Sequence, residues 1–274
     1  MPIRKDKLRT ALSTIQKAEG EGYCCPSEFV KLLMNVNINR KIGVELPPIG
    51  SFMQYISQDL SNIEIITNRL AWQRDLYSDN QLEVGDWMRF AACDIDLFHV
   101  ELRSIFDYLE KIIQKVADYP ENVPDKGFND LRNWLLDPEN NVKEENVKRL
   151  GKDLADLVLS VDWFNDLKNI RDISVHQGGM TIVFLEKDRI LFQIWKGYGN
   201  LISIPEIMYN ENVVDFELYA GMYFGYLIAF LEEASKTIEK RLPPRKSALG
   251  AGNPRKVYRK LPEIYLWIEK VQSL

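Results

Sequence analysis

The chain has 274 residues, of which 46% are hydrophobic and 27% are charged, a composition typical of a globular protein with a buried core. These proportions exclude a chain that is disordered throughout. The net charge of −5 excludes a protein whose whole surface is built to bind nucleic acid, so a polyanion would have to meet a local basic region.

The cysteines and the apolar runs indicate the cellular compartment. The three cysteines are the adjacent Cys24 and Cys25 together with Cys93, an odd number without a C-x-x-C spacing. This pattern argues against a disulfide framework and for a reducing cytoplasm. No apolar run follows the charged N-terminal residues, so no signal peptide is evident. The longest apolar run, Leu218 to Leu231, is too short to span a bilayer, and we expect no membrane association.

The N-terminal part of the chain predicts helices on both sides of a linker. Short helices are expected over residues 3–18 and 26–35. Two prolines and two glycines fall within residues 43–50, and this density interrupts any helix. Ser51 is a suitable cap for a further helix that runs to about Tyr77.

The clearest predicted helix begins at Asp86, a favourable N-cap. Apolar residues then recur in alternating steps of four and three, namely Ala91, Ile95, Phe98, Leu102, Ile105, Leu109, Ile112 and Val116. This spacing predicts a helix of about 30 residues with one face in the core of a bundle. The helix is expected to end before Pro120 and Pro124.

Three shorter helices are expected next, over residues 128–136, over residues 143–159 and after Asp162, which is the predicted cap of the third. The apolar side of this third helix consists of Trp163, Leu167, Ile170 and Ser174. Gly178 and Gly179 are predicted to end it, since glycine is favoured just after a helix.

The only convincing strand pattern lies in residues 181–195, where two β-branched and aromatic runs flank a charged tetrapeptide and predict a hairpin. A third short strand is a candidate over residues 201–204. Asp215 opens a last long helix that runs to about Arg241. A basic linker rich in proline and glycine leads from it to a short helix over residues 262–271.

These elements predict a mainly α protein, an antiparallel helical bundle with a small inserted β-hairpin. Residues 1–42 are expected to form a helical extension and residues 51–241 the bundle, with the hairpin at 181–195. Residues 242–274 are expected to form the basic linker and a C-terminal helix.

The candidate reactive residues lie at the end of the helix after Asp162, in the sequence Arg171-Asp172-Ile173-Ser174-Val175-His176. This ending resembles the R-x4-6-H motif of HEPN domains, which are helical RNase and nucleotide-binding modules. The resemblance covers about residues 51–241 and implies a homodimer whose motif residues face the twofold axis. It implies catalytic roles for Arg171 and His176, with Asp172 as the polar residue that follows the arginine.

The residue types fit RNA cleavage without a metal or another cofactor. Histidine titrates near neutrality, so His176 is a candidate general acid or base. Arg171 keeps its charge and offers a fork that matches a phosphate in its transition state. Positions five apart on a helix differ by roughly 140° in direction, so the two residues converge only if the last turn unwinds. The alternative is that His176 merely favours the helix dipole and Arg171 forms a surface ion pair.

Other candidate residues have structural explanations beside the functional ones. His99 is expected to be a boundary histidine bonded to a neighbour, and Glu101 and Asp107 are weak candidates for positioning Arg171. Residues 236–260 contain nine basic residues and one acid. Their weak RNA-binding candidates are Lys240, Arg241, Arg245, Lys246, Arg255, Lys256, Arg259 and Lys260. A solvated helix end and linker is the alternative for this segment.

The sequence therefore supports two hypotheses from different classes. The first is a cytoplasmic, homodimeric, metal-independent endoribonuclease of HEPN type, as found in toxin–antitoxin, phage-defence or RNA-maturation systems. The second is a non-catalytic helical dimer that binds a nucleotide, an RNA or a protein such as an antitoxin through the same cleft. A third reading is a helical interaction module in which the motif is accidental.

Overall fold

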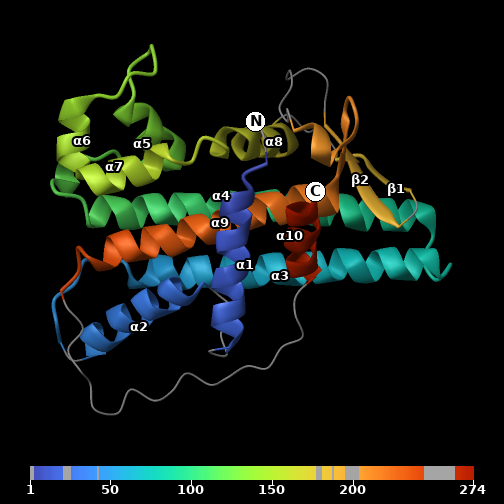
Figure 1. Cartoon of the computed structure of the whole chain (residues 1–274), viewed down its shortest axis with the longest axis horizontal. Coiled ribbons are helices and arrows are strands. Elements are labelled where there is room, and N and C mark those ends of the chain that lie inside the picture. Colours follow the sequence, from blue (N-terminus) through green and yellow to red (C-terminus); the bar gives the residue numbers. More distant parts are fainter. Residues whose placement is uncertain are drawn as a thin grey trace.

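The computed structural model describes residues 3–20, 26–41, 43–176, 181–186, 188–194, 204–243 and 263–274. Its helices are α1 (Lys5–Gly20), α2 (Ser27–Lys41), α3 (Gly50–Ser78), α4 (Val84–Lys115), α5 (Phe128–Leu135), α6 (Glu144–Leu150), α7 (Lys152–Leu159), α8 (Phe164–His176), α9 (Phe216–Glu239) and α10 (Glu263–Ser273). The described part of the chain is thus mainly helical, as the apolar periodicity predicts (Figure 1).

Three long helices, α3, α4 and α9, lie side by side along the long axis of the molecule (Figure 1). Helices α3 and α4 form an antiparallel hairpin, in which Arg69 of α3 bonds to Asp94 of α4. The first turn of α9 is tied to the end of α3 through Arg74 and Glu217, so α9 runs antiparallel to α3 and parallel to α4. The pairs α3–α4 and α3–α9 are therefore antiparallel, as predicted for the long helices, whereas α4 and α9 are parallel to each other.

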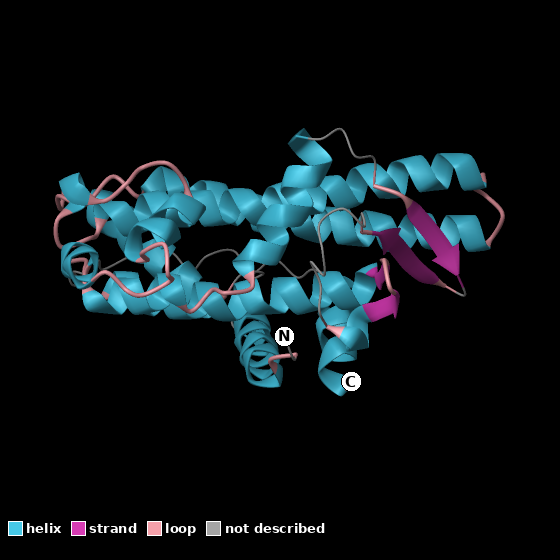
Figure 2. Ribbon diagram, turned by 90° about the horizontal axis from the view of Figure 1, so that it is seen from above, coloured by secondary structure: helices cyan, strands magenta, loops and turns pink. Residues whose placement is uncertain are grey.

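Helices from both ends of the chain pack across α9, and α1 and α10 project from the same side of the long helices (Figure 2). Two glycines of α9 permit these contacts. A Cβ at Gly221 would lie 2.5 Å from the carbonyl carbon and oxygen of Trp267 in α10. A Cβ at Gly225 would lie 2.7 Å from Leu8 of α1. Glycine at these positions lets the crossing helices approach closely enough to bury α9 almost completely.

The small sheet contains the strands β1 (Val183–Glu186), β2 (Arg189–Gln193), β3 (Met208–Asn210) and β4 (Val213–Asp215). All neighbours pair antiparallel in the order β1-β2-β4-β3. The hairpin prediction is confirmed, whereas β3 and β4 were not predicted because each has only three residues. In the candidate strand over residues 201–204, only Ile204 is described, and it is not in a strand.

Two predicted caps and one predicted helix are wrong in detail. Helix α3 begins at Gly50 and α4 at Val84, so Ser51 and Asp86 lie inside these helices and are not their N-caps. The helix expected over residues 143–159 is divided into α6 and α7 at Gly151, whose φ of +96° lies outside the range of a right-handed helix. Arg241 from the end of α9 lies against this glycine, and a Cβ there would lie within 2.2 Å of its guanidinium. The bend between α6 and α7 therefore accommodates a contact that comes from a distant part of the chain.

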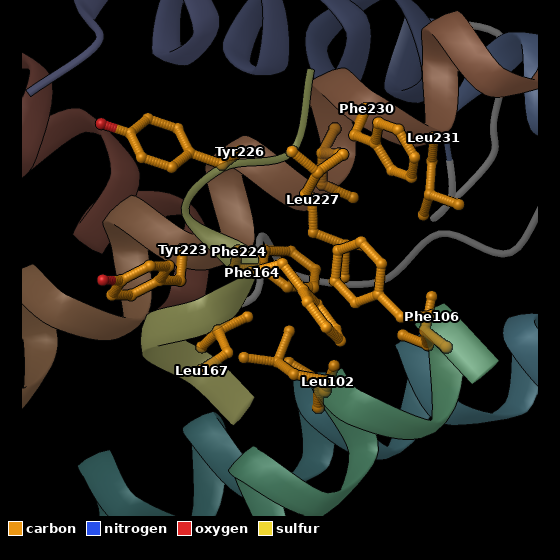
Figure 3. Close-up of a cluster of buried hydrophobic side chains, with 14 of the residues drawn as sticks. Leu102, Phe106, Phe164, Leu167, Tyr223, Phe224, Tyr226, Leu227, Phe230 and Leu231 are labelled. Carbon is orange, nitrogen blue, oxygen red and sulfur yellow. The ribbon is translucent and has the colours of Figure 1, made fainter. Parts of the chain in front are cut away.

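Helix α8 is held in the core between α4 and α9, where the ring of its Phe164 packs against Phe106 of α4, which also stacks on Phe230 of α9 (Figure 3). The predicted apolar side of this helix is confirmed for Trp163, Leu167 and Ile170, which are all buried, whereas the side chain of Ser174 lies outside the described residues. The same core contains residues from α1, α2 and α10, so residues of all three predicted segments contribute to it. The core thereby fixes the position of the helix that carries the motif.

Candidate functional site

The motif positions lie in the second half of α8, which remains helical through His176. Position 171 follows the buried Leu167 by one turn, whereas position 176 follows Asp172 by one turn. The helix thus places the two motif positions roughly 140° apart around its axis. Unwinding before His176, the condition for convergence within one chain, does not occur. The side chains of Arg171 and His176 and the predicted glycine stop at 178–179 lie outside the described residues.

Asp172 is the motif residue whose side chain is described. It is half-buried, and its carboxylate lies 4.0 Å from the ammonium group of Lys168, one turn earlier on α8. An ion pair at this spacing on a surface contributes only about 0.3–0.5 kcal/mol. Lys168, Asp172 and position 176 therefore form one polar face of the helix, and an acidic group of that face is within reach of position 176.

The other histidine, His99 on α4, lies in the core and not at a boundary. Its Nδ1 lies 2.7 Å from the carbonyl oxygen of Ile95, and its Nε2 lies 2.8 Å from the hydroxyl of Tyr219 on α9. Because a carbonyl can only accept, Nδ1 carries the proton and the tyrosine hydroxyl donates to Nε2. Burial lowers the pKa of His99 to about 4, so the ring is neutral near pH 7. The prediction of a hydrogen-bonded histidine is confirmed.

A second buried polar contact joins α8 to α9. The hydroxyl of Tyr223 donates to the carboxylate of Asp166 over 3.0 Å, and burial raises the pKa of Asp166 to about 6. The rings of Tyr219 and Tyr223 are 4.7 Å apart, so the His99 and Asp166 contacts are neighbours on α9. Both tyrosine rings are fully buried in the core. In the sequence, only the four-residue spacing of Tyr219 and Tyr223, which places both on one face of α9, indicates that these two hydroxyls lie close together.

The two weak positioning candidates have other described contacts. The carboxylate of Asp107 accepts from the backbone nitrogen of Phe128 over 3.2 Å and thereby holds the start of α5. Glu101 forms a hydrogen bond with Asp59 of α3, and burial raises its pKa to about 7. Each carboxyl group therefore connects α4 to a neighbouring helix.

Two of the eight RNA-binding candidates are described, and they differ. Lys240 follows the last residue of α9 and is exposed. Arg241 forms ion pairs with Asp118, at 2.7 Å, and with Asp153, and it also donates to the carbonyl oxygen of Val116. Its charge is thus balanced within the chain. The remaining candidates, Arg245, Lys246, Arg255, Lys256, Arg259 and Lys260, lie outside the described residues.

An open, charged pocket of about 690 Å³ lies where α3, α9, α10 and the β1–β2 turn meet. The buried Glu217 accepts from Arg74 of α3, at 2.5 Å, and from Lys270 of α10, at 2.8 Å. Arg189 lies 4.0 Å from Asp215, the N-cap of α9, whose carboxylate accepts from the Glu217 and Leu218 nitrogens as predicted for this cap. The basic groups are paired with acids, so this pocket joins helices and offers no dedicated anion site.

Within the described ranges, no three His, Cys, Asp or Glu side chains are grouped so that they could hold a metal ion. Within the same ranges, no helix has both the length and the apolarity needed to cross a membrane. Comparisons with protein-family models, with curated proteins and with solved structures gave no match.

Proposed function

We propose that the protein is a metal-independent endoribonuclease of HEPN type that acts on RNA at a cleft between two copies. One observation carries this proposal. The Arg171-Asp172-x3-His176 motif occupies the end of a helix, α8, that is held against the long helix α4 of a mainly helical protein. This is the placement that the resemblance implies for the motif.

The chemistry follows from the properties of the two motif residues. Attack of a ribose 2′-oxygen on the adjacent phosphorus requires one proton transfer from the attacking hydroxyl and one to the leaving oxygen. His176 carries out such transfers near neutral pH, and Arg171 stabilises the negative charge that develops on the phosphate oxygens. His99 takes no part in this chemistry, because it is neutral, buried and bonded at both ring nitrogens.

The geometry of α8 explains why the proposal requires two copies. Positions 171 and 176 lie roughly 140° apart on a regular helix, so one helix does not present both to a single phosphate. When two such helices meet about a twofold axis, the arginine of one copy and the histidine of the other are able to face the same cleft. The composite cleft also supplies two histidines, one for each proton transfer.

The second candidate is a non-catalytic HEPN-like dimer that binds a nucleotide, an RNA or a protein such as an antitoxin. The observation that favours it is the uninterrupted helix through His176, which separates the two motif positions. Binding of a phosphate by Arg171 would not require the histidine to lie close to it.

Cleavage of labelled single-stranded RNA in EDTA tests both candidates. We expect the wild-type protein to leave 2′,3′-cyclic phosphate ends and the variants Arg171→Ala and His176→Ala to lose this activity. Lys152→Ala, at an exposed position on α7, is the control and should retain it. RNA binding without cleavage by the folded wild type would favour the binding protein, and equal cleavage by all variants would reject the motif as the site.

A further inference from the structure

The buried residues that join α8 to the core are mostly apolar. Phe164, Leu167 and Ile170 are buried, and Leu167 lies at the centre of this apolar side of the helix. Apolar burial is non-directional, because its free energy follows the area removed from water. An apolar side therefore sets the rotation of a helix about its own axis less sharply than a hydrogen bond does, since a hydrogen bond weakens steeply with distance and angle.

Asp166 makes a directional contact at the edge of this apolar side. It precedes Leu167 by one residue and lies roughly 100° from the centre of the side. Its carboxylate accepts the 3.0 Å hydrogen bond from the hydroxyl of Tyr223 on α9. Rotation of α8 moves a group at the edge directly toward or away from the neighbouring helix, whereas it moves a group at the centre sideways. The contact of Asp166 with Tyr223 is therefore well placed to oppose rotation of α8.

Tyr223 is a fixed partner for Asp166. Its side chain is fully buried, and its ring centre lies 4.7 Å from that of Tyr219 and 5.9 Å from that of Trp163. Tyr219 is bonded in turn to His99 of α4. The hydroxyl that holds Asp166 thus belongs to a part of the core in which α4 and α9 are already joined. Asp166 attaches α8 to this part of the core.

The rotation of α8 decides where the two motif positions face. The helix is continuous from Phe164 to His176, so a rotation at Asp166 is carried to positions 171 and 176. A rotation of about 20° moves a group ~6 Å from the helix axis by about 2 Å. A displacement of ~1 Å at a catalytic group can lower the reaction rate on the order of 100-fold. A small rotation of α8 is therefore enough to separate a correctly placed motif from a misplaced one.

The ionisation of Asp166 strengthens its contact with Tyr223. Burial raises the pKa of Asp166 to about 6, so the carboxylate is ionised near pH 7 in surroundings that disfavour its charge. A charged acceptor holds a hydroxyl more strongly than a neutral acceptor does. Carboxylates kept ionised in such surroundings are frequent at functional sites.

We propose that Tyr223 and Asp166 are positioning residues, whose hydrogen bond sets the rotation of α8 and thereby the directions in which positions 171 and 176 face. Neither residue takes part in the chemistry itself. Their importance for RNA cleavage rests on the proposed function, whereas their effect on the direction of position 176 does not.

The histidine signals of the folded protein test the proposal at pH 7.5 without RNA. The chain has two histidines, so its proton–carbon spectrum contains two histidine Cε1 signals, which His176→Ala assigns. Tyr223→Phe removes the donor and Asp166→Ala removes the acceptor, so both should move the His176 signal from its wild-type position. Tyr226→Phe is the matched control, because its hydroxyl points to the same side of α9 (Figure 3) but bonds to the backbone nitrogen of Arg4. It should leave the signal in place.

Cleavage kinetics of the same variants give a second measurement. We expect kcat to fall ~100-fold in Tyr223→Phe and Asp166→Ala, with KM changed by less than about threefold. Asp166→Asn keeps an acceptor for the Tyr223 hydroxyl and should restore kcat to within ~10-fold of the wild type. Both Asp166 variants lose the same charge, so this pair separates the effect of the hydrogen bond from that of the charge.

A His176 signal that stays in place in Tyr223→Phe and Asp166→Ala would overturn the proposal, whether or not the protein cleaves RNA. An equal displacement in Tyr226→Phe or Asp166→Asn would overturn it as well. A displaced signal with an unchanged kcat would overturn the role in cleavage. A wild type that leaves RNA intact, together with a displaced signal in Tyr223→Phe, would reject the proposed function alone.

Discussion

Helix α9 and the side of α3–α4 that faces away from it both carry large apolar side chains, but only α9 is covered by its own chain. Gly221 and Gly225 let α10 and α1 approach α9 closely, and almost every residue of α9 is buried. The side of α3–α4 that faces away from α9 instead presents Trp72, Phe90 and Leu97 to solvent. The difference shows that large apolar residues alone do not bring a covering helix, whereas the local shape created by the two glycines of α9 does.

Replacing Gly221 tests the covered region and should have the largest effect. In Gly221→Val, the new side chain would overlap the Trp267 backbone, so α10 must move away. We expect a loss of about 3 kcal/mol in the free energy of unfolding, measured by urea denaturation, with faster amide exchange in α10. Gly85→Ala is the control, because a Cβ at Gly85 meets no atom within 4 Å. Equal destabilisation by both variants would contradict this account of α9.

Tyr219→Phe should have the next largest effect. The variant removes the hydroxyl that donates to His99 and leaves Nε2 buried without that donor. The expected loss is about 1–2 kcal/mol in the same denaturation experiment. Tyr119→Phe, at a side chain 55% exposed, provides the comparison and should change stability by less than about 0.5 kcal/mol. A neutral Tyr219→Phe would mean that the contact with His99 contributes nothing to stability.

Glu101 of α4, which forms a hydrogen bond with Asp59 of α3, should make the stability of the α3–α4 contact depend on pH. Its pKa is about 7 in the folded protein, compared with an ordinary value of 4.5, so the folded state keeps a proton that the unfolded chain releases. Stability should therefore fall as the pH rises from 4.5 through 7. Glu101→Gln should remove this fall and exceed the wild type at pH 8 by on the order of 1 kcal/mol, reduced by partial solvent exposure.

Thermal unfolding from pH 4 to pH 8 at constant chain concentration measures the effect of Glu101. The control is Glu45→Gln, at an exposed position, and it should retain the pH profile of the wild type. If Glu101→Gln also retained that profile, the proton shared with Asp59 would not contribute to the stability of the α3–α4 contact.

Ile65→Lys should have the smallest effect on stability. Ile65 is exposed, so a lysine at this position meets solvent. The free energy of unfolding should change by less than about 0.5 kcal/mol in urea denaturation. A loss of about 2 kcal/mol or more would show that Ile65 packs against its own chain.

Sequence patterns predicted the elements whose signals are local. The alternating steps from Ala91 to Val116 identify α4, and Asp215 caps α9 as expected. The break at Gly151 could not be predicted in this way, because it accommodates Arg241 from the end of another helix. The Tyr223–Asp166 and Tyr219–His99 contacts join residues 57 and 120 positions apart, and no local spacing contains that information.

The candidate site illustrates the same limit. The sequence identifies the motif and the helix that carries it, and the structure places that helix between α4 and α9. Convergence of Arg171 with His176 depends on whether the helix unwinds, and a residue spacing cannot decide this. Because α8 is continuous through His176, the two motif positions do not share a face within one chain, and their convergence depends on how two copies assemble.

The contact of α10 with Gly221 has a consequence for the order in which the chain folds during synthesis. Residues of α9 leave the ribosome well before Glu263, the first residue of α10. During that interval, the Gly221 side of α9 lacks the helix that finally covers it. The nascent chain therefore carries a temporary apolar groove of its own, one that closes without a partner once α10 has been made.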